Sequence, residues 1–130
     1  MSQTDNTPHA PLNRESIRTF VIDACGGEPE LVLEMVEFFL QSATKLTAEI
    51  ETHLAANNMP EARRAAHSLK SGSRMFGDDT LADLCWRAEK SADENDRGIV
   101  SELLPQIQVA VAWLCNELPV TARKMLEEGP

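Results

Sequence analysis

The sequence contains no tyrosine, few aromatic residues (5%) and only three cysteines, which are widely separated. An odd number of cysteines without a C-x-x-C pair excludes a disulfide framework and a zinc site of the usual spacing, and is typical of reduced thiols. The longest apolar run, Val109 to Cys115, is far shorter than the ~18 residues of a membrane-spanning helix. The polar N-terminus also lacks the apolar segment of a secretory signal. We therefore expect a cytoplasmic protein with no membrane insertion.

Basic residues are also scarce. The 130 residues include 12 Lys and Arg against 21 Asp and Glu, which gives a formal charge of −9. A chain this acidic is a poor general binder of nucleic acid or of an anionic membrane. Hydrophobic residues make up 42%, the composition of a globular protein, and the length fits one domain. We expect a flexible N-terminal tail over residues 1–12 and one folded domain over residues 13–130.

No segment shows the apolar–polar alternation of a β-strand, whereas helical spacing continues through the chain. Asn13 is a candidate N-cap, Gly26 and Gly27 end the first helix, and Pro29 fits the first turn of the second. Asp78 or Asp79 is the expected cap of the fourth helix, whose buried face is expected to consist of Leu81, Leu84, Cys85 and Ala88. The following helices are expected over residues 29–56, 60–76, 79–94 and 99–118, with a short terminal helix over residues 119–128. Pro105 either kinks the last long helix or lies in its first turn. The pattern predicts an all-α fold, an antiparallel four-helix bundle with short additional terminal helices.

The helix expected over residues 29–56 is apolar over an unusually wide arc. Its central stripe is formed by Val32, Met35, Val36, Phe39, Ala43, Leu46 and Ile50. Leu33, Phe38 and Leu40 lie beside this stripe. Either a neighbouring helix covers them or they form a docking surface for a partner.

The helix expected over residues 60–76 has a different character. Ala62, Ala65, Leu69, Gly72 and Phe76 fall on one side of it and form its core face. His67 projects from the opposite side and is predicted to face solvent. The basic residues Arg63, Arg64, Lys70 and Arg74, together with Ser71, lie on the same side as His67. An outward imidazole in a local cationic field on an acidic protein indicates a site that handles phosphate, although a solvated helix face has the same pattern.

The segment His67-Ser68-Leu69-Lys70, with Gly77 ten residues after the histidine, resembles the histidine-containing phosphotransfer (HPt) domain of bacterial two-component phosphorelays. The family pattern is approximately H-x-L-K-G, five residues, then G. The resemblance extends over residues 13–118, because a long helix precedes the motif and a capped helix carrying Leu84 and Glu89 follows it.

The resemblance implies a role for each residue of the motif. His67 would be the phosphoacceptor, Lys70 would lie beside the phosphoryl oxygens, and Gly77 would end this helix region. Ser71 stands where the family usually has glycine, with Gly72 one place later. Its hydroxyl is one turn from His67 and is placed either to hydrogen-bond the imidazole or to crowd a partner. The site expected from the sequence therefore has four parts: the phosphoacceptor His67; the phosphoryl-stabilising Lys70, Ser71 and Arg74; the structural Leu69, Gly72 and Gly77; and the docking residues Arg63, Arg64, Leu33, Phe38 and Leu40.

The implied function is that of a signal-transduction phosphoprotein, a carrier rather than an enzyme. His67 would take a phosphoryl group from a receiver-domain aspartate and pass it to another receiver. The expected partners are receiver domains of response regulators or a hybrid sensor histidine kinase. No cofactor is expected on this chain, since the resemblance assigns Mg²⁺ to the receiver. We expect a monomer, because no uncovered heptad seam stands out beyond the second helix.

Other readings of the same residues remain open at this point. The chain is alternatively a helical adaptor that binds a receiver or kinase without being phosphorylated. An enzyme that uses His67 as a base or metal ligand lacks a second ligand at suitable spacing, because His53 is fourteen residues away. Nucleic-acid binding would need aromatic residues among the basic ones. His9 and His53 have no comparable surroundings, and structural or incidental roles are expected for both.

Overall fold

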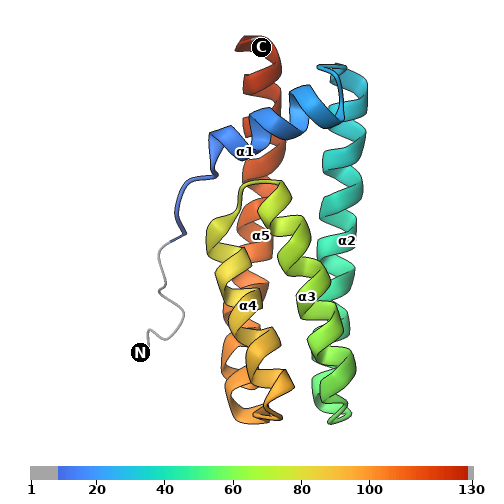
Figure 1. Ribbon diagram of the computed structural model, residues 1–130, viewed down its shortest axis with the longest axis vertical. Helices are drawn as coiled ribbons and strands as arrows, with labels where there is room; N and C mark the ends of the chain where they lie inside the picture. Colours follow the sequence, from blue (N-terminus) through green and yellow to red (C-terminus); the bar gives the residue numbers. More distant parts are fainter. Residues whose placement is uncertain (1–8, 129–130) are drawn as a thin grey trace.

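The computed structural model describes residues 9–128, which form a bundle of helices without strands (Figure 1). A short helix, α1 (Arg14–Thr19), leads into a π-helical turn, η1 (Phe20–Ala24). The four long helices are α2 (Pro29–Ala55), α3 (Met59–Met75), α4 (Asp79–Asp93) and α5 (Arg97–Glu128). The predicted all-α four-helix fold is therefore confirmed.

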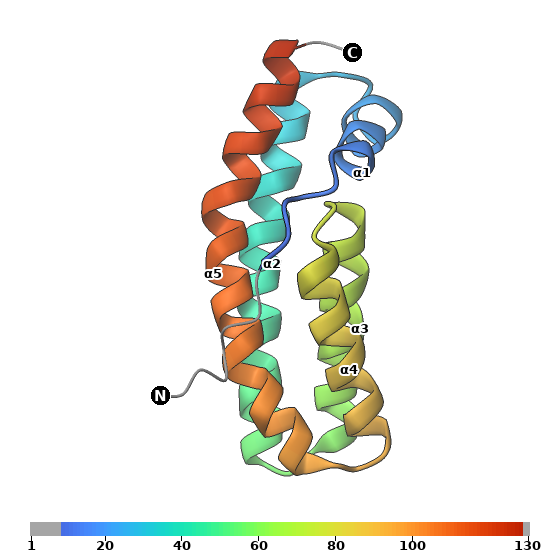
Figure 2. The ribbon, with the colours of Figure 1, turned by 90° about the vertical axis from the view of Figure 1, so that its left-hand side faces the viewer.

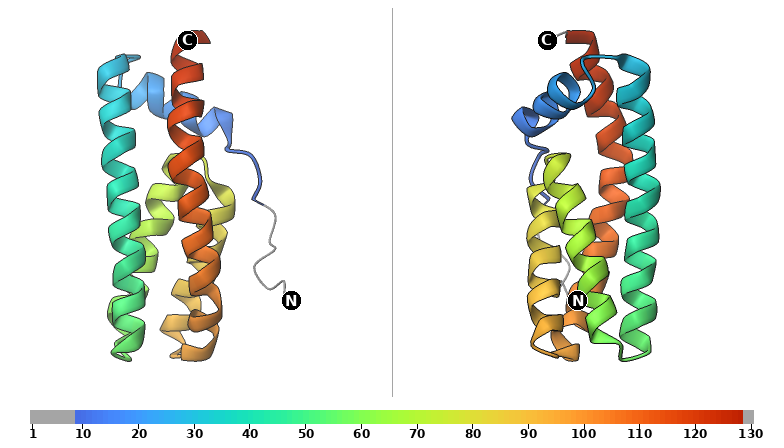
Figure 3. Two further views of the ribbon diagram at one scale, coloured as in Figure 1. Left: turned by 180° about the vertical axis from the view of Figure 1, so that it is seen from behind. Right: turned by 45° about the vertical axis from the view of Figure 1, so that its right-hand side comes forward.

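The long helices form a ring in which each packs against two others. α3 contacts α2 and α4, and α5 contacts the same two helices, so α3 and α5 stand diagonally opposite one another. α2 and α5 are nearly twice as long as α3 and α4, and they extend beyond this pair at one end (Figure 2). α1 and η1 lie across the shorter pair at that end, and Figure 3 shows the same arrangement from behind.

The caps predicted from the sequence are the caps that the structure uses. Asn13 Oδ1 accepts hydrogen bonds from the backbone N–H groups of Glu15 and Ser16, and Asp78 Oδ1 accepts one from Leu81. The predicted core faces of α3 and α4 are also buried, except that Gly72 is half-buried. The residues of α4 in this set are Leu81, Leu84, Cys85 and Ala88.

Gly77 joins the N-terminal segment to the α3–α4 turn. Its carbonyl accepts a hydrogen bond from Asn13 N at 2.7 Å, and its φ of +78° is in the left-handed region. A Cβ atom here would lie 2.6 Å from Asn13 O. Only glycine meets both conditions without strain. Next to this contact, the ring of Phe76 packs between the rings of Phe20 and Phe39, with centroid separations of 4.6 and 4.5 Å.

The expectation of a separate terminal helix is wrong. Residues 119–128 continue α5 through Pro119, since Leu118, Ala122 and Met125 stay on one buried face. Of the two positions left open for Pro105, the structure has the one inside α5, and the helix bends along its length (Figure 2). The apolar stripe of α2 is also narrower than expected, because Met35 is exposed.

The last four residues of the predicted tail, residues 9–12, lie against the bundle; residues 1–8 are outside the described part. Nε2 of His9 lies 2.8 Å from Oδ1 of the buried Asp78, and its ring stacks on Trp113 with centroids 3.6 Å apart. The Ala10 N–H donates to Thr80 Oγ1, and Leu12 is buried. His9 therefore has a structural role, one of the two roles expected for it.

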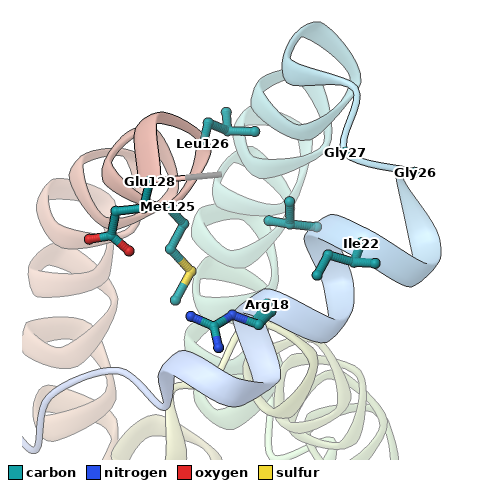
Figure 4. Close-up of a pocket in the computed structure, with 8 residues that line it drawn as sticks. Arg18, Ile22, Gly26, Gly27, Met125, Leu126 and Glu128 are labelled. Atoms are coloured by element: carbon teal, nitrogen blue, oxygen red, sulfur yellow. The ribbon is translucent and has the colours of Figure 1, made fainter. Parts of the chain in front are cut away.

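An apolar hollow of about 240 Å³ lies between η1 and the C-terminal end of α5 (Figure 4). It is lined by Arg18, Val21, Ile22, Gly26, Gly27, Met125, Leu126 and Glu128. The hollow is formed by the ends of the elements and shares no residue with the helix face that carries His67.

Candidate functional site

His67 lies on the outer side of α3, as its position in the sequence predicts. Its side chain is 55% exposed, while Leu69, two residues later, is fully buried. Ala65 and Ala66 are also buried, so the backbone beneath His67 is fixed by packing on the core. The imidazole is therefore presented to solvent from a rigid helix.

Glu89 of α4 links His67 to Lys70. Glu89 Oε2 lies 2.9 Å from Nδ1 of His67, and Oε1 lies 2.7 Å from Nζ of Lys70. The side chains of Glu89 and Lys70 are 16% and 12% exposed. The acid and the ammonium are thus mostly buried between α3 and α4, with the imidazole at the outer edge of the group.

Burial alone would raise the pKa of Glu89, but its contacts with Lys70 and His67 outweigh burial and hold that pKa below its usual value. Glu89 is therefore ionised at neutral pH, and a carboxylate can only accept a hydrogen bond. It follows that Nδ1 of His67 carries the proton in the bond to Glu89. In the neutral ring the lone pair is then on Nε2, the atom farther from α4.

The remaining residues predicted for the site are distributed around this group. Arg63 reaches toward α4, with Nη1 3.7 Å from Glu89 Oε2. Arg64 is directed to Glu61 instead, at 3.5 Å, and Arg74 is exposed on the next turns of α3. Arg63 and Lys70 therefore belong to the charge cluster at His67, whereas Arg64 is engaged within its own helix.

Ser71 is exposed one turn after His67. Its Oγ donates to the backbone carbonyl of His67 at 3.2 Å, which is the usual bond of a helical serine to the preceding turn. The hydroxyl is therefore directed to the backbone of α3. Of the two possibilities left open by the sequence, a bond to the imidazole or crowding of a partner, the bond is not formed. The motif glycine next to it, Gly72, faces α2, where it adjoins the ring of Phe39.

Glu89 and Trp86 were not among the site residues expected from the sequence. The position of Glu89 could have been found by pairing the two helices about the turn at Gly77. Glu89 follows Gly77 by twelve residues, and His67 precedes Gly77 by ten. If the two helices are antiparallel, Glu89 and His67 therefore lie at about the same height along them. Trp86 lies one turn before Glu89 and is 45% exposed. It lines two polar hollows beside the site, one with Lys70 and Glu89 and the other with Arg74.

The apolar docking residues expected on α2 have different surroundings. Phe38 is 69% exposed, whereas Leu33 and Leu40 are half-buried and Leu40 packs against the core. Because Phe39 contacts Gly72, Phe38 lies about 8 Å along α3 from the level of His67, at ~1.5 Å per residue. Of the three, Phe38 is thus the residue available to a partner.

Comparison with known proteins agrees with this architecture. The family model described as "Hpt domain" matches residues 34–119, more than half of the chain. The chain belongs to the Hpt domain family. Among solved structures, the crystal structure of histidine-containing phosphotransfer protein B (HptB) from Pseudomonas aeruginosa PAO1 is similar, with a TM-score of 0.75 and 18% identity over 96% of this chain and 100% of that chain. No curated protein matches the sequence significantly.

The Hpt match begins within α2 and ends within α5, so it contains the whole charge cluster formed by α3 and α4. α1, η1 and the docked residues 9–12 lie outside it. Hpt domains take part in histidine phosphotransfer within phosphorelays and interact with receiver domains. The recognised resemblance to this family is thereby confirmed.

Proposed function

We propose that this Hpt protein is a cytoplasmic phosphocarrier in which Nε2 of His67 receives a phosphoryl group from a receiver-domain aspartate and passes it to another receiver. The observation that carries the proposal is the pairing of Nδ1 of His67 with Glu89 on a ring that is 55% exposed. This pairing directs the nucleophilic lone pair to the accessible nitrogen.

In the proposed step, the Nε2 lone pair attacks the phosphorus of the aspartyl phosphate. The Nε2–P bond forms, the P–O bond to the aspartate breaks, and the receiver regains its carboxylate. The imidazole ring gains positive charge while Nδ1 keeps its proton. The adjacent Glu89 carboxylate stabilises this charge, and it does so without reorganisation because Lys70 already holds it in place.

Lys70 has two proposed roles in this step. It balances the charge of Glu89, and it supplies positive charge beside the incoming phosphoryl oxygens, together with the exposed Arg74; Ser71, whose hydroxyl is bonded to the His67 carbonyl, is assigned no part in this step. Phosphoryl transfer depends mainly on positioning and on such charge neutralisation. Because Glu89, the acid at His67, is engaged by Lys70 and His67, we assign the Mg²⁺ to the receiver and no cofactor to this chain.

The proposed receiver contact combines charged and apolar groups. Exposed ion pairs contribute about 0.2–1 kcal/mol each, so the exposed Arg63 and Arg74 cannot hold a receiver alone. Phe38 of α2 and Trp86 of α4, on the two helices that pack against α3, provide exposed apolar surface. Burial of this surface, at about 25 cal/mol per Å², supplies the remaining affinity.

The test is transfer of radioactive phosphate from a panel of phosphorylated receivers to the wild type and to His67→Gln. His53→Gln is the matched control, since His53 is a half-buried histidine of α2 outside the charge cluster. We expect acid-labile, base-stable label on the wild type and on the His53 variant only. Label that persists in His67→Gln would contradict the proposal. Absence of label from every receiver would instead favour the unphosphorylated adaptor.

A further inference from the structure

α5 leaves much of its apolar surface uncovered. An 18-residue window of this helix is long and apolar enough to cross a membrane, yet only 39% of it is buried inside the protein. Its buried face packs between α2 and α4, as a core helix does. On the other face Val109 is 55% exposed and Val120 is 46% exposed, and Pro105 and Ala112 are exposed beside them.

This face is also uncharged over an unusual length. No Asp, Glu, Lys or Arg occurs between Leu103 and Asn116, in a chain with 25% charged residues. A solvent-exposed helix face normally carries charged side chains. Two copies of a protein with a net charge of −9 repel one another over most of their surface, but this repulsion is least where α5 is uncharged.

Seven of the exposed residues of α5 recur at intervals of three and four. The α5 outer seam, as we call it, consists of Glu102, Pro105, Val109, Ala112, Asn116, Val120 and Arg123. Such spacing keeps residues on one line along a helix and fits the packing of two helices at a shallow angle. The seam has an acid near one end and a base near the other, and the residues between them are apolar except for Asn116.

We propose that the α5 outer seam binds the same seam of a second copy of this chain, with the two helices antiparallel about a twofold axis between Val109 and Ala112. In this register Val109 faces Ala112 of the second copy, and the reverse contact follows from symmetry. Glu102 then lies within about one helical turn, ~6 Å along the axis, of Arg123 of the second copy. The two ends of the seam are thus complementary in charge when it meets itself.

The size of the seam sets the strength of this pairing. From Glu102 to Arg123 it extends about 33 Å, at ~1.5 Å per residue. A contact between one pair of helices of this length falls below the ~1,200 Å² of a standard interface, which is the range of weak, concentration-dependent association. The proposal therefore revises the monomer expected from the sequence to a monomer–dimer equilibrium.

The dimer is compatible with phosphotransfer but independent of it. α5 stands diagonally opposite α3, so pairing through α5 leaves both copies of His67 on outer faces of the assembly. His9 covers Trp113 at one side of the seam by stacking on it, whereas Val109 and Ala112 at its centre are exposed in the part of the chain that the structure describes.

Sedimentation equilibrium from about 5 to 500 μM, a range suited to weak association, tests the proposal. We expect the apparent mass of the wild type to rise from 14.4 kDa toward twice that value. Val109→Glu should weaken association at least tenfold, because it places two like charges at the twofold axis. Phe38→Glu, which changes a still more exposed apolar side chain on α2, should leave the association unchanged. Both variants alter exposed side chains, and circular dichroism checks that they fold.

A charge exchange tests the register. Glu102→Arg and Arg123→Glu should each weaken association, and the double variant should restore it. A mass of 14.4 kDa at every concentration, or association that Val109→Glu does not affect, would overturn the proposal. So would Val109-dependent binding to phosphatidylcholine vesicles without self-association, which would make the face a membrane surface. Val109→Glu should still accept phosphate from a receiver; loss of that transfer would make the face a receiver contact and would equally reject the dimer.

Discussion

The ring of Phe39 in α2 occupies the space that a side chain on Gly72 of α3 would need. A Cβ atom at residue 72 would overlap Cε1 of Phe39, and this ring is itself stacked on Phe76 at 4.5 Å. Gly72 thus sets how closely α2 and α3 approach, one and a half turns beyond His67. The position of the imidazole depends on a contact on the opposite side of its helix.

We expect Gly72→Ala to destabilise the protein by up to about 2 kcal/mol in urea unfolding. Overpacking of this kind costs about 1–3 kcal/mol, and the preference of helices for alanine offsets about 1 kcal/mol of it. Phe39→Leu should recover part of the loss in the double variant. Ser71→Ala, on the exposed side of the same turn, should stay within about 0.5 kcal/mol of the wild type. Equal effects of Gly72→Ala with and without Phe39 would contradict this account.

Because of Glu89, the free energy of unfolding should depend on pH in the acid range. Its folded-state pKa is below the usual value, so the ionised form stabilises the fold above about pH 4.3. This stabilisation is lost as the pH falls through the lower folded-state pKa. The difference in unfolding free energy between the wild type and Glu89→Gln should therefore be largest at neutral pH and shrink below about pH 5.

Asp93→Asn is the control for that measurement. Asp93 also belongs to α4 and faces Arg63 at 3.9 Å, but its side chain is 75% exposed. Its replacement should leave the acid dependence unchanged. If Asp93→Asn reduced the pH dependence of the unfolding free energy as much as Glu89→Gln, this dependence would come from the general charge of α4 rather than from the contacts of Glu89 with Lys70 and His67.

The sequence predicts well what local rules decide. Pro29 opens α2, Asn13 and Asp78 cap their helices, and the spacing of apolar residues separates the core face of α3 from the face of His67. Pro119 shows the limit of local rules: a proline normally ends a helix, but here the burial of Leu118 and Ala122 on either side keeps α5 continuous.

Contacts between helices are the part that the sequence alone does not supply. A pattern along α3 says that His67 faces outward but not which residue of α4 stands beside it. Glu89 is found only when the turn at Gly77 is used to align the two helices. The contact between His9 and Asp78 could not be predicted from the sequence, because the two residues are 69 positions apart and His9 lies in a segment without helical periodicity.

His9 should stabilise the fold through the buried carboxylate of Asp78. Burial raises the pKa of Asp78, while Leu81 N–H and His9 lower it, and the net shift is upward. A raised carboxyl pKa means stability that is full below about pH 3.9 and is lost as the pH rises through the folded-state pKa. His9→Ala removes a partner of the charged form, so we expect it to cost about 1–3 kcal/mol at neutral pH and less near pH 3.

The double variant with Asp78→Asn isolates that effect. An asparagine keeps the carbonyl oxygen that caps Leu81 N but carries no charge, so His9→Ala should cost less in this background. Trp113 fluorescence, measured with Trp86 replaced by Phe, reports the stacked ring directly. The same loss in both backgrounds at both pH values would mean that His9 acts only by stacking on Trp113.

Trp86 should contribute to receiver binding although it does not touch the phosphoryl group. It borders both hollows beside the charge cluster, and its side chain is 45% exposed in the free protein. Truncation of an aromatic anchor of this kind typically costs about 2 kcal/mol or more of binding free energy, and a tenfold change in affinity corresponds to about 1.4 kcal/mol.

We expect Trp86→Ala to weaken receiver binding at least tenfold in titration calorimetry while leaving the unfolding midpoint unchanged, since the ring is not part of the core. Val120→Ala, at a similarly exposed site on α5, which stands diagonally opposite the His67 helix α3, should bind as the wild type does. If both variants bound equally well, the receiver would have to dock on the α2 side of His67, where Phe38 is the apolar group that remains.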